Sequence, residues 1–519
     1  MQKIGAICSP SKIILHKFPL SPSFHSIMNL HYVKGFFIDE KSLMKNYFYN
    51  LSYQILVVLT PFITIPYLAR VLGPESIGLA SFSSSIVSYF SLFASLGIGL
   101  YGQREIAYRQ DDPKGRSKTF FELTLLRLVL MLLSLTAYST FVVPRMYHRA
   151  IFMLQGLNIA ATFFDITWFF QGLEEFGKIA ARNVLLRFIT VASFFLFIHS
   201  PEDLGLYIGL LAGLSLVTNL SLWFFLPRYL VRVPKEELHI VRHLSPLIAL
   251  FIPQIAVNLY TLMDRTMIGL AAASTLQNGY YEQAEKTVRI TLTIVTSLIP
   301  VMIPRMAYAF ARKDHEKVIQ GMKLSYQFVS LLSFPICFGL MAVAPNFVPW
   351  FFGPNYLPVI PLVRILSLIV IAIGLSNVTG NQYLVPTNKQ AILTKSVLVG
   401  AVCNFILNLL FIPYAMAAGA AAASVLTELI VMGVQFYLVR CALPLRDILL
   451  GSRTHLFASL IMFGLVTFAA GSLSPSLVHT ALLVLLGGAS YFLLLLLFKD
   501  DMTHLVIQKF TNLLTHKRS

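Results

Sequence analysis

The feature that most constrains this chain is a succession of apolar stretches, each about 20 residues long and separated by short loops. About 20 apolar residues, at 1.5 Å per residue, cross the ~30 Å hydrocarbon core of a bilayer as one helix. Fourteen stretches follow one another, at 47–69, 76–100, 119–143, 150–170, 178–198, 204–226, 244–269, 284–303, 324–343, 357–379, 391–412, 416–438, 454–472 and 477–498. The sequence therefore predicts an all-α polytopic membrane protein with about 14 transmembrane helices.

Positive charge alternates from loop to loop. The even-numbered loops and the C-terminal tail hold 25 lysines and arginines, whereas the odd-numbered loops hold three, Arg70, Arg145 and Arg149. Because lysine and arginine are retained on the cytoplasmic side, this bias predicts an even number of spans. Both ends of the membrane domain are then cytoplasmic, in a bacterial cytoplasmic (inner) membrane.

The composition agrees with a membrane protein. Hydrophobic residues make up 56% of the chain, charged residues 12%, and the net charge is +17. Most of that charge lies in the predicted cytoplasmic loops, where anionic lipid accounts for it, so we expect no nucleic-acid partner. The four cysteines are far apart and lack metal-ligand spacing, so we expect no metal site.

The first 43 residues stand outside this pattern. Their longest apolar run is Ile13–Leu15, which is too short for the core of a cleaved signal peptide. We interpret residues 1–43 as a disordered extension or a mis-assigned start, with Met44 as the alternative first residue. The rest of the chain has no Gly-Lys-Ser/Thr phosphate-binding loop and no large outer loop, which favours a transporter over an enzyme, without catalytic residues.

A weak internal repeat divides the membrane domain. The pattern QxLxxxxKxA occurs at Gln171–Ala180 and again at Gln382–Ala391, and Gly78 is matched by Gly279 at a similar offset. Matches at equivalent points predict two pseudo-symmetric six-helix lobes in the same orientation, at 44–243 and 244–440. Two extra helices at 441–498 and a cytoplasmic tail at 499–519 follow.

Four segments carry a family resemblance: Tyr67–Gly78, Asp165–Glu174, Gly279–Lys286 and Asn381–Pro386. With them, residues 44 to about 500 resemble the Wzx-type polysaccharide flippases of the multidrug/oligosaccharidyl-lipid/polysaccharide exporter superfamily. The resemblance implies MATE-like lobes that work by alternating access. It also implies an undecaprenyl-diphosphate-linked oligosaccharide cargo for capsule, exopolysaccharide or O-antigen synthesis, with a polysaccharide polymerase and a chain-length regulator as partners.

Charged residues inside the spans are candidates for cargo contacts, because they are costly in a bilayer and usually face a cavity or a partner. Glu282, Glu285, Lys286 and Arg289 share one face of the eighth span. A diphosphate that crosses the low-dielectric centre needs cations, and arginine can form bidentate hydrogen bonds with phosphate oxygens. The predicted substrate-binding residues are Arg187, Lys286, Arg289 and Arg364. The alternative is that these charges pair with one another and only fix helix packing.

A second group of polar residues is a candidate for ion coupling. Asp264 lies in the seventh span, and Asn404 and Asn408 lie four residues apart in the eleventh. Such oxygen ligands suit a hard cation such as Na⁺, and Glu285 or Glu428 is the candidate carrier if the coupling ion is a proton. The alternative is that both asparagines form interhelical hydrogen bonds. No other cofactor is expected.

Other functions remain open from the sequence. A cation-coupled multidrug exporter of the same superfamily would favour an acidic cavity, and a peptidoglycan-precursor flippase would share the predicted cargo chemistry. A membrane polysaccharide polymerase would act on the same lipid-linked sugars, but it would need a large outer loop with catalytic residues.

Overall fold

The computed structural model describes residues 40–500 and 502–504. The predicted extension therefore lies outside the described residues up to residue 39, as does most of the predicted tail. The described residues contain helices and no strand. The α-helices are α2 (Glu40–Ser95), α3 (Ile98–Ala107), α4 (Pro113–Ala137), α5 (Arg149–Phe164), α6 (Thr167–Gly172), α7 (Phe176–Phe197), α8 (Leu204–Leu220), α9 (Leu244–Ala271), α10 (Leu276–Thr296), α11 (Ile299–Ala311), α12 (His315–Phe351), α13 (Val359–Leu366), α14 (Leu368–Asn377), α15 (Gln390–Val439), α16 (Leu445–Leu450), α17 (Arg453–Gly471) and α18 (Leu477–Leu497).

The predicted number of spans is confirmed. Within the described residues, 10 segments are long and apolar enough to cross a membrane. Two of them contain two spans each, because α2 breaks at Gly73 (φ 74°) and α15 breaks at Met416 (φ 43°). With these breaks and with α7 and α9, the described chain has fourteen helical spans.

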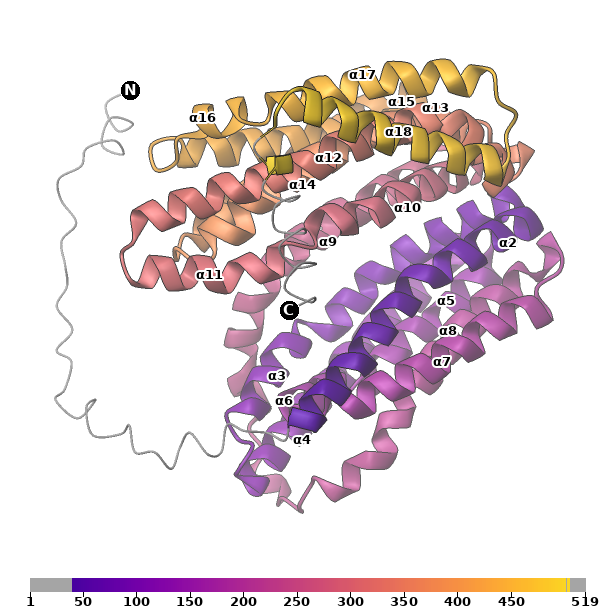
Figure 1. The fold of residues 1–519 in the computed structure, drawn as a ribbon. Coiled ribbons are helices and arrows are strands. Elements are labelled where there is room, and N and C mark those ends of the chain that lie inside the picture. Colours follow the sequence, from indigo (N-terminus) through magenta and orange to yellow (C-terminus); the bar gives the residue numbers. More distant parts are fainter. Residues whose placement is uncertain (1–39, 501, 505–519) are drawn as a thin grey trace.

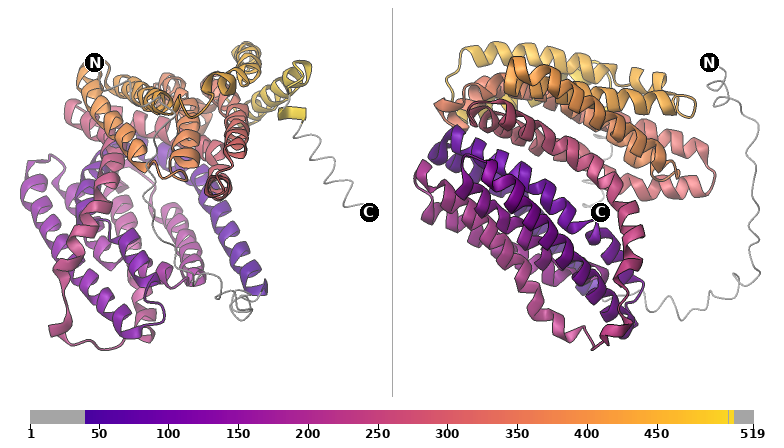
Figure 2. Two further views of the ribbon diagram at one scale, coloured as in Figure 1. Left: turned by 90° about the vertical axis from the view of Figure 1, so that its left-hand side faces the viewer. Right: turned by 180° about the vertical axis from the view of Figure 1, so that it is seen from behind.

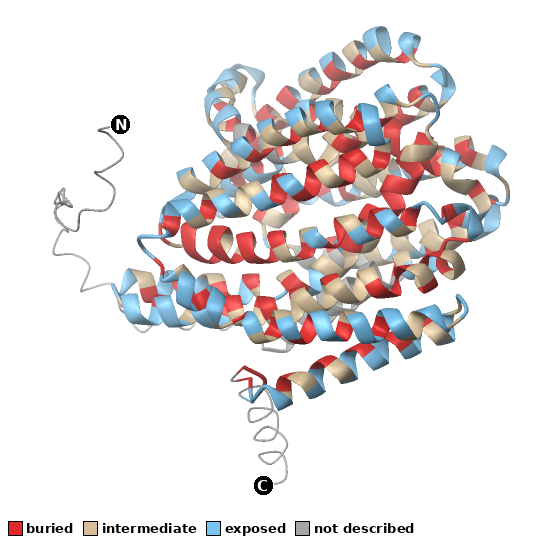
Figure 3. Ribbon diagram, turned by 90° about the horizontal axis from the view of Figure 1, so that it is seen from above, coloured by how far each residue is buried: buried red, intermediate tan, exposed pale blue. Residues whose placement is uncertain are grey.

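The helices form two lobes (Figure 1). The first lobe contains α2 to α8 and the second contains α9 to α16, with α9 also in contact with α2 of the first lobe. Helices α17 and α18 pack against α12 on the outer side of the second lobe, as both views of Figure 2 show. Large apolar side chains such as Phe224 and Phe468 are exposed on the outside, while buried residues lie where helices pack against one another (Figure 3). An apolar surface of this extent fits a lipid environment.

The two ends of the bundle differ in charge. We call the end with the lysine- and arginine-containing loops 108–112, 228–243 and 312–314 the basic end, and the end with the turns at 73–75, 272–275 and 352–358 the far end. Figure 1 shows the lobes meeting at the far end and separating toward the basic end. The predicted orientation places the basic end in the cytoplasm.

Backbone contacts close the far end. Gly78 of α2 and Gly279 of α10 lie where the two lobes meet, and both are the positions matched in the sequence repeat. A Cβ atom at Gly78 would lie 1.8 Å from the carbonyl oxygen of Thr275, and one at Gly279 would lie 1.8 Å from that of Pro74. Only glycine allows this approach. The Tyr356 hydroxyl of the second lobe also donates to the carbonyl of Ala69 in the first lobe at 3.1 Å.

Candidate functional site

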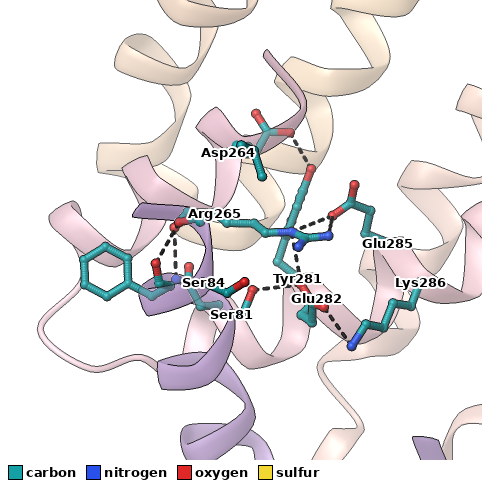
Figure 4. A network of polar contacts seen from close by, with 12 residues as sticks. Ser81, Ser84, Asp264, Arg265, Tyr281, Glu282, Glu285 and Lys286 are labelled. Carbon is teal, nitrogen blue, oxygen red and sulfur yellow. Dashed lines mark hydrogen bonds and ion pairs between the residues drawn. The ribbon is translucent and has the colours of Figure 1, made fainter. Parts of the chain in front are cut away.

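An ion-pair network lies at the junction between α9 and α10 (Figure 4). The guanidinium of Arg265 in α9 contacts two carboxylates of α10, with Nε 3.0 Å from Glu282 Oε2 and Nη2 2.8 Å from Glu285 Oε2. Both glutamates are buried. Because a buried carboxylate needs a partner, Arg265 stabilises the charged face that the sequence predicts on this helix.

The two predicted cargo contacts on α10 belong to this network. Lys286 Nζ lies 2.8 Å from Glu282 Oε1, and Arg289 Nε lies 2.5 Å from Glu285 Oε1. Their side chains remain 41% and 49% exposed, respectively. The network thus pairs these cations, as in the alternative interpretation, but leaves one side of each accessible to an anion.

The network reaches the first lobe through serine hydroxyls. Ser81 Oγ of α2 donates to Glu282 Oε2 at 2.8 Å, as Figure 4 shows. One turn further along α2, Ser85 Oγ lies 2.9 Å from the Thr266 hydroxyl of α9. Ser81 is one turn from Gly78, so the network lies next to the contact that closes the far end.

Asp264 forms a separate buried cluster with α10 and α15. Its Oδ1 accepts hydrogen bonds from Asn408 Nδ2 at 2.6 Å and from Asn404 Nδ2 at 3.2 Å. Its Oδ2 accepts from the Tyr281 hydroxyl at 2.5 Å and from the Ser424 hydroxyl. The structure therefore brings together Asp264, Asn404 and Asn408, the three residues predicted as ligands of a hard cation.

Tyr281 and Ser424 complete this cluster, and the sequence reasoning missed both. Tyr281 belongs to one of the segments that carry the family resemblance, but hydroxyls are common in spans and give no positional signal. Ser424 follows the break at Met416, which turns the second half of α15 back beside the first half. Its contact with Asp264 depends on that turn.

The cluster has the chemistry of a small-cation site. Asn408 Oδ1 and Thr427 Oγ1 are buried and lack a hydrogen-bond partner among the described residues. Asn404, Thr427 and Glu428 line the same cavity as Asp264, and the cavity volume is about 30 Å³. That volume suits one or two water-sized occupants and excludes a sugar. Unpartnered oxygen atoms beside a carboxylate are the ligands that hard cations prefer.

Glu285 and Glu428 connect the cavity with the ion-pair network. Both line the cavity, together with Arg289. Glu285 is bound by Arg265 and Arg289, whereas Glu428 has no ion pair within 4.0 Å in the described part of the chain. Of the two predicted proton carriers, Glu428 is therefore the one with its carboxyl group free of a cation.

The other two predicted cargo contacts lie elsewhere. Arg364 of α13 is exposed, and its Nε donates to the carbonyl of Met341 in α12 at 3.1 Å. Arg187 of α7 is partly buried, and its Nε lacks a hydrogen-bond partner among the residues described. The structure does not join either residue to the network by an ion pair within its described part.

A second buried cluster fixes the connection between the lobes. Glu122 of α4 accepts from the backbone amide of His239 at 2.6 Å, from Arg242 Nη2 at 2.5 Å and contacts His243 Nε2 at 2.8 Å. The other ring nitrogen of His243 lies 2.8 Å from the Tyr101 hydroxyl of α3. The start of α9 is thereby tied to the first lobe at the basic end.

The chain matches a known family over more than half of its length. The model of the family described as "Polysaccharide biosynthesis protein" matches residues 43–310. Among similar proteins, a putative O-antigen transporter of Escherichia coli (strain K12) is 24% identical over 408 residues, which cover 78% of this chain and 98% of that protein. The lipopolysaccharide biosynthesis protein WzxC of the same strain is 27% identical over 124 residues, which cover 24% of each chain.

Solved structures share the fold at low sequence identity. The lipid II flippase MurJ in an inward closed conformation matches with a TM-score of 0.69 at 13% identity, covering 88% of this chain and 99% of that chain. An inward-facing multidrug resistance MATE family transporter of the MOP superfamily matches with a TM-score of 0.57 at 15% identity, covering 73% and 94%. The fold of this chain is thus shared with known membrane proteins.

Proposed function

The chain belongs to the polysaccharide biosynthesis protein family, and from this membership we propose that it is a flippase for lipid-linked oligosaccharides. It moves undecaprenyl-diphosphate-linked repeat units across the bacterial cytoplasmic membrane by alternating access, for capsule, exopolysaccharide or O-antigen synthesis. The names of the similar O-antigen transporters support this cargo class. We place the basic end in the cytoplasm, so that the described conformation is closed toward the outside.

The observation that carries the proposal is the mixed network on α10. Lys286 and Arg289 hold positive charge inside the membrane domain, and each is about half exposed. A diphosphate can replace a carboxylate oxygen at these cations, because the buried Glu282 and Glu285 both stay paired with Arg265. A purely acidic cavity would instead favour an exporter of cationic drugs.

The coupling ion is proposed to bind at the cluster of Asp264, Asn404 and Asn408. Na⁺ would take oxygen atoms from Asp264, from the asparagine amides and from Thr427, whose hydroxyl lacks a protein partner in the described residues. A proton would instead use Glu428 or Glu285. The side chain of Tyr281 is bound to Asp264, so occupancy of the cluster acts directly on α10.

Flipping in proteoliposomes tests the proposed cargo. The purified chain is reconstituted with a fluorescent undecaprenyl-diphosphate oligosaccharide, and a membrane-impermeant glycosidase reports the fraction of sugar in the outer leaflet. We expect transfer above the level in protein-free vesicles. Lys286→Gln and Arg289→Gln should each lower the flipping rate at least tenfold, which corresponds to about 1.4 kcal/mol. Lys395→Gln is the matched control, because Lys395 is an exposed lysine of α15.

Folded protein that moves no lipid-linked sugar under any gradient would refute the proposal. Parallel vesicles with a lipid-linked peptidoglycan precursor separate the two flippase functions, because both cargoes carry a polyprenyl diphosphate. Asp264→Asn tests the coupling site: we expect flipping to lose its dependence on a Na⁺ or pH gradient, whereas Asp111→Asn in an exposed loop keeps it. A polysaccharide polymerase and a chain-length regulator stay proposed partners.

A further inference from the structure

A second pocket lies at the basic end of the second lobe, away from the ion-pair network. It is formed by α11 and the first turns of α12, whose positions Figure 1 shows. Its volume is about 550 Å³, which is within the range of pockets that bind small molecules. The pocket at Asp264 is too small for an organic ligand, whereas this one accommodates a phosphate with attached groups.

The lining of this pocket is amphipathic. Met302, Met306 and Leu324 provide apolar surface, and Arg305, Lys317 and Gln320 provide polar groups. Apolar surface beside two cations matches the chemistry of a lipid headgroup, in which a phosphate is joined to a hydrocarbon chain. A soluble anion would not use the apolar part.

Both cations are available to a ligand. Arg305 is exposed and has no ion pair within the described residues. Lys317 is paired with Asp314 at 2.8 Å, but its side chain is 74% exposed. An exposed ion pair contributes about 0–1 kcal/mol, so a phosphate can displace it. The guanidinium of Arg305 can bind two phosphate oxygens at once.

The depth of the pocket matches a lipid headgroup. Lys317 lies in the first turn of α12, next to the loop at 312–314. Arg305 lies six residues before the end of α11, which is about 9 Å along a helix axis. The headgroup region of a bilayer has a similar thickness on each side of the hydrocarbon core. The pocket therefore extends from the membrane surface to the edge of the hydrocarbon.

We propose that the α11–α12 pocket binds the phosphate group of a membrane lipid, with Arg305 and Lys317 as its ligands. Helix α11 continues, after a break at residues 297–298, the segment whose first part is α10. A lipid bound at Arg305 is thus held at the basic end of the same span that carries Lys286 and Arg289. That the lipid is the transported cargo rests on the proposed function, whereas phosphate binding itself does not.

Lipid binding to the full chain in detergent tests the proposal. Native mass spectrometry measures the binding of undecaprenyl diphosphate, phosphatidylglycerol and phosphatidylcholine to the wild type, to Arg305→Gln and to Lys317→Gln. Lys323→Gln is the matched control. It removes one positive charge from α12, the helix of Lys317, at a position outside the pocket. Arg305→Lys keeps the positive charge but cannot form bidentate hydrogen bonds with a phosphate.

We expect both pocket variants to weaken binding of at least one anionic lipid by about tenfold or more, while Lys323→Gln has little effect. Preference for undecaprenyl diphosphate identifies the cargo as the ligand, and equal binding of phosphatidylglycerol identifies a bulk anionic lipid. Equal losses in Lys323→Gln, or unchanged binding in both pocket variants, would overturn the proposal. Size-exclusion profiles establish that each variant is folded.

Flipping assays separate this inference from the proposed function. If the pocket loads cargo, Arg305→Gln raises the half-saturating cargo concentration and leaves the maximal rate unchanged. A wild type that flips while Arg305→Gln binds and flips normally refutes the pocket alone. A wild type that binds undecaprenyl diphosphate in an Arg305-dependent way but never flips it refutes the transport function alone.

Discussion

Substitution of Gly279 by alanine should open the far end of the protein. The new Cβ would lie 1.8 Å from the carbonyl oxygen of Pro74 and 2.8 Å from its carbonyl carbon. Both are backbone atoms, so no side-chain rotation relieves the overlap. Because carbon contacts settle near 3.5 Å, the two helix ends must separate by roughly 1.7 Å.

The magnitude follows from where the overlap occurs. Overpacking in a well-packed contact costs about 1–3 kcal/mol, and here the cost applies only while the lobes touch at the far end. Alanine also favours a helix over glycine by about 1 kcal/mol, but in both conformations, so this gain cancels. The ratio of closed to open molecules should therefore fall by about 5- to 150-fold.

Double electron–electron resonance between two spin labels measures the distance between the lobes, and so the ratio of closed to open molecules. The labels are at Tyr147→Cys and Ser472→Cys, in a background without the native cysteines. Tyr147 lies on an exposed turn of the first lobe, and Ser472 lies on the exposed turn between α17 and α18, which pack against the second lobe. We expect Gly279→Ala to add a population with a longer distance. Gly433→Ala is the control, because a Cβ at Gly433 has no atom within 4 Å. An unchanged distance distribution in a Gly279→Ala protein of normal stability would show that the glycine contact does not hold the lobes closed.

Two further predictions concern groups outside the proposed transport path. Glu122→Gln leaves Arg242 without its buried carboxylate and should lower the free energy of unfolding by about 1–3 kcal/mol, measured by thermal denaturation. The control Glu236→Gln, on the exposed loop, should change this free energy by less than about 0.5 kcal/mol. Burial raises the pKa of Asp500, but the neighbouring His455 ring, 3.3 Å away, and a hydrogen bond from the backbone amide of Thr503 lower that pKa by more, to well below the usual range. A lowered pKa in the folded state means that the ionised carboxylate stabilises the protein above about pH 4 and that this stabilisation is lost as the pH falls. We therefore expect Asp500→Asn to lower the unfolding temperature at pH 7 more than at pH 3; an equal decrease at both values would contradict this.

The sequence predicted the spans well, because about 20 consecutive apolar residues leave a chain few alternatives. It also predicted that Asp264, Asn404 and Asn408 belong together, since polar groups inside a membrane must find one another. It did not predict the contact of Ser424, which depends on the turn at Met416.

A position inside a span was a weaker guide to the surroundings of single cations. Lys286 and Arg289 lie on the charged face that helical spacing predicts. Arg364 instead donates to a carbonyl of a neighbouring helix, and its side chain is exposed. A long side chain can reach a backbone acceptor or the membrane surface, so the position of its Cα does not fix the position of its charge.

The link between the two polar clusters is a pair of adjacent residues in α9. Successive side chains of a helix are rotated by about 100°, so Asp264 faces α15 and Tyr281 while Arg265 faces Glu282 and Glu285 of α10. Any movement of α9 that changes the contacts of Asp264 therefore also changes those of Arg265. Glu282 in turn accepts a hydrogen bond from Ser81, one turn from the glycine contact of the far end. The path from the proposed ion site to the closure of the lobes thus passes through two direct side-chain contacts, Arg265–Glu282 and Glu282–Ser81, and each of them can be removed separately.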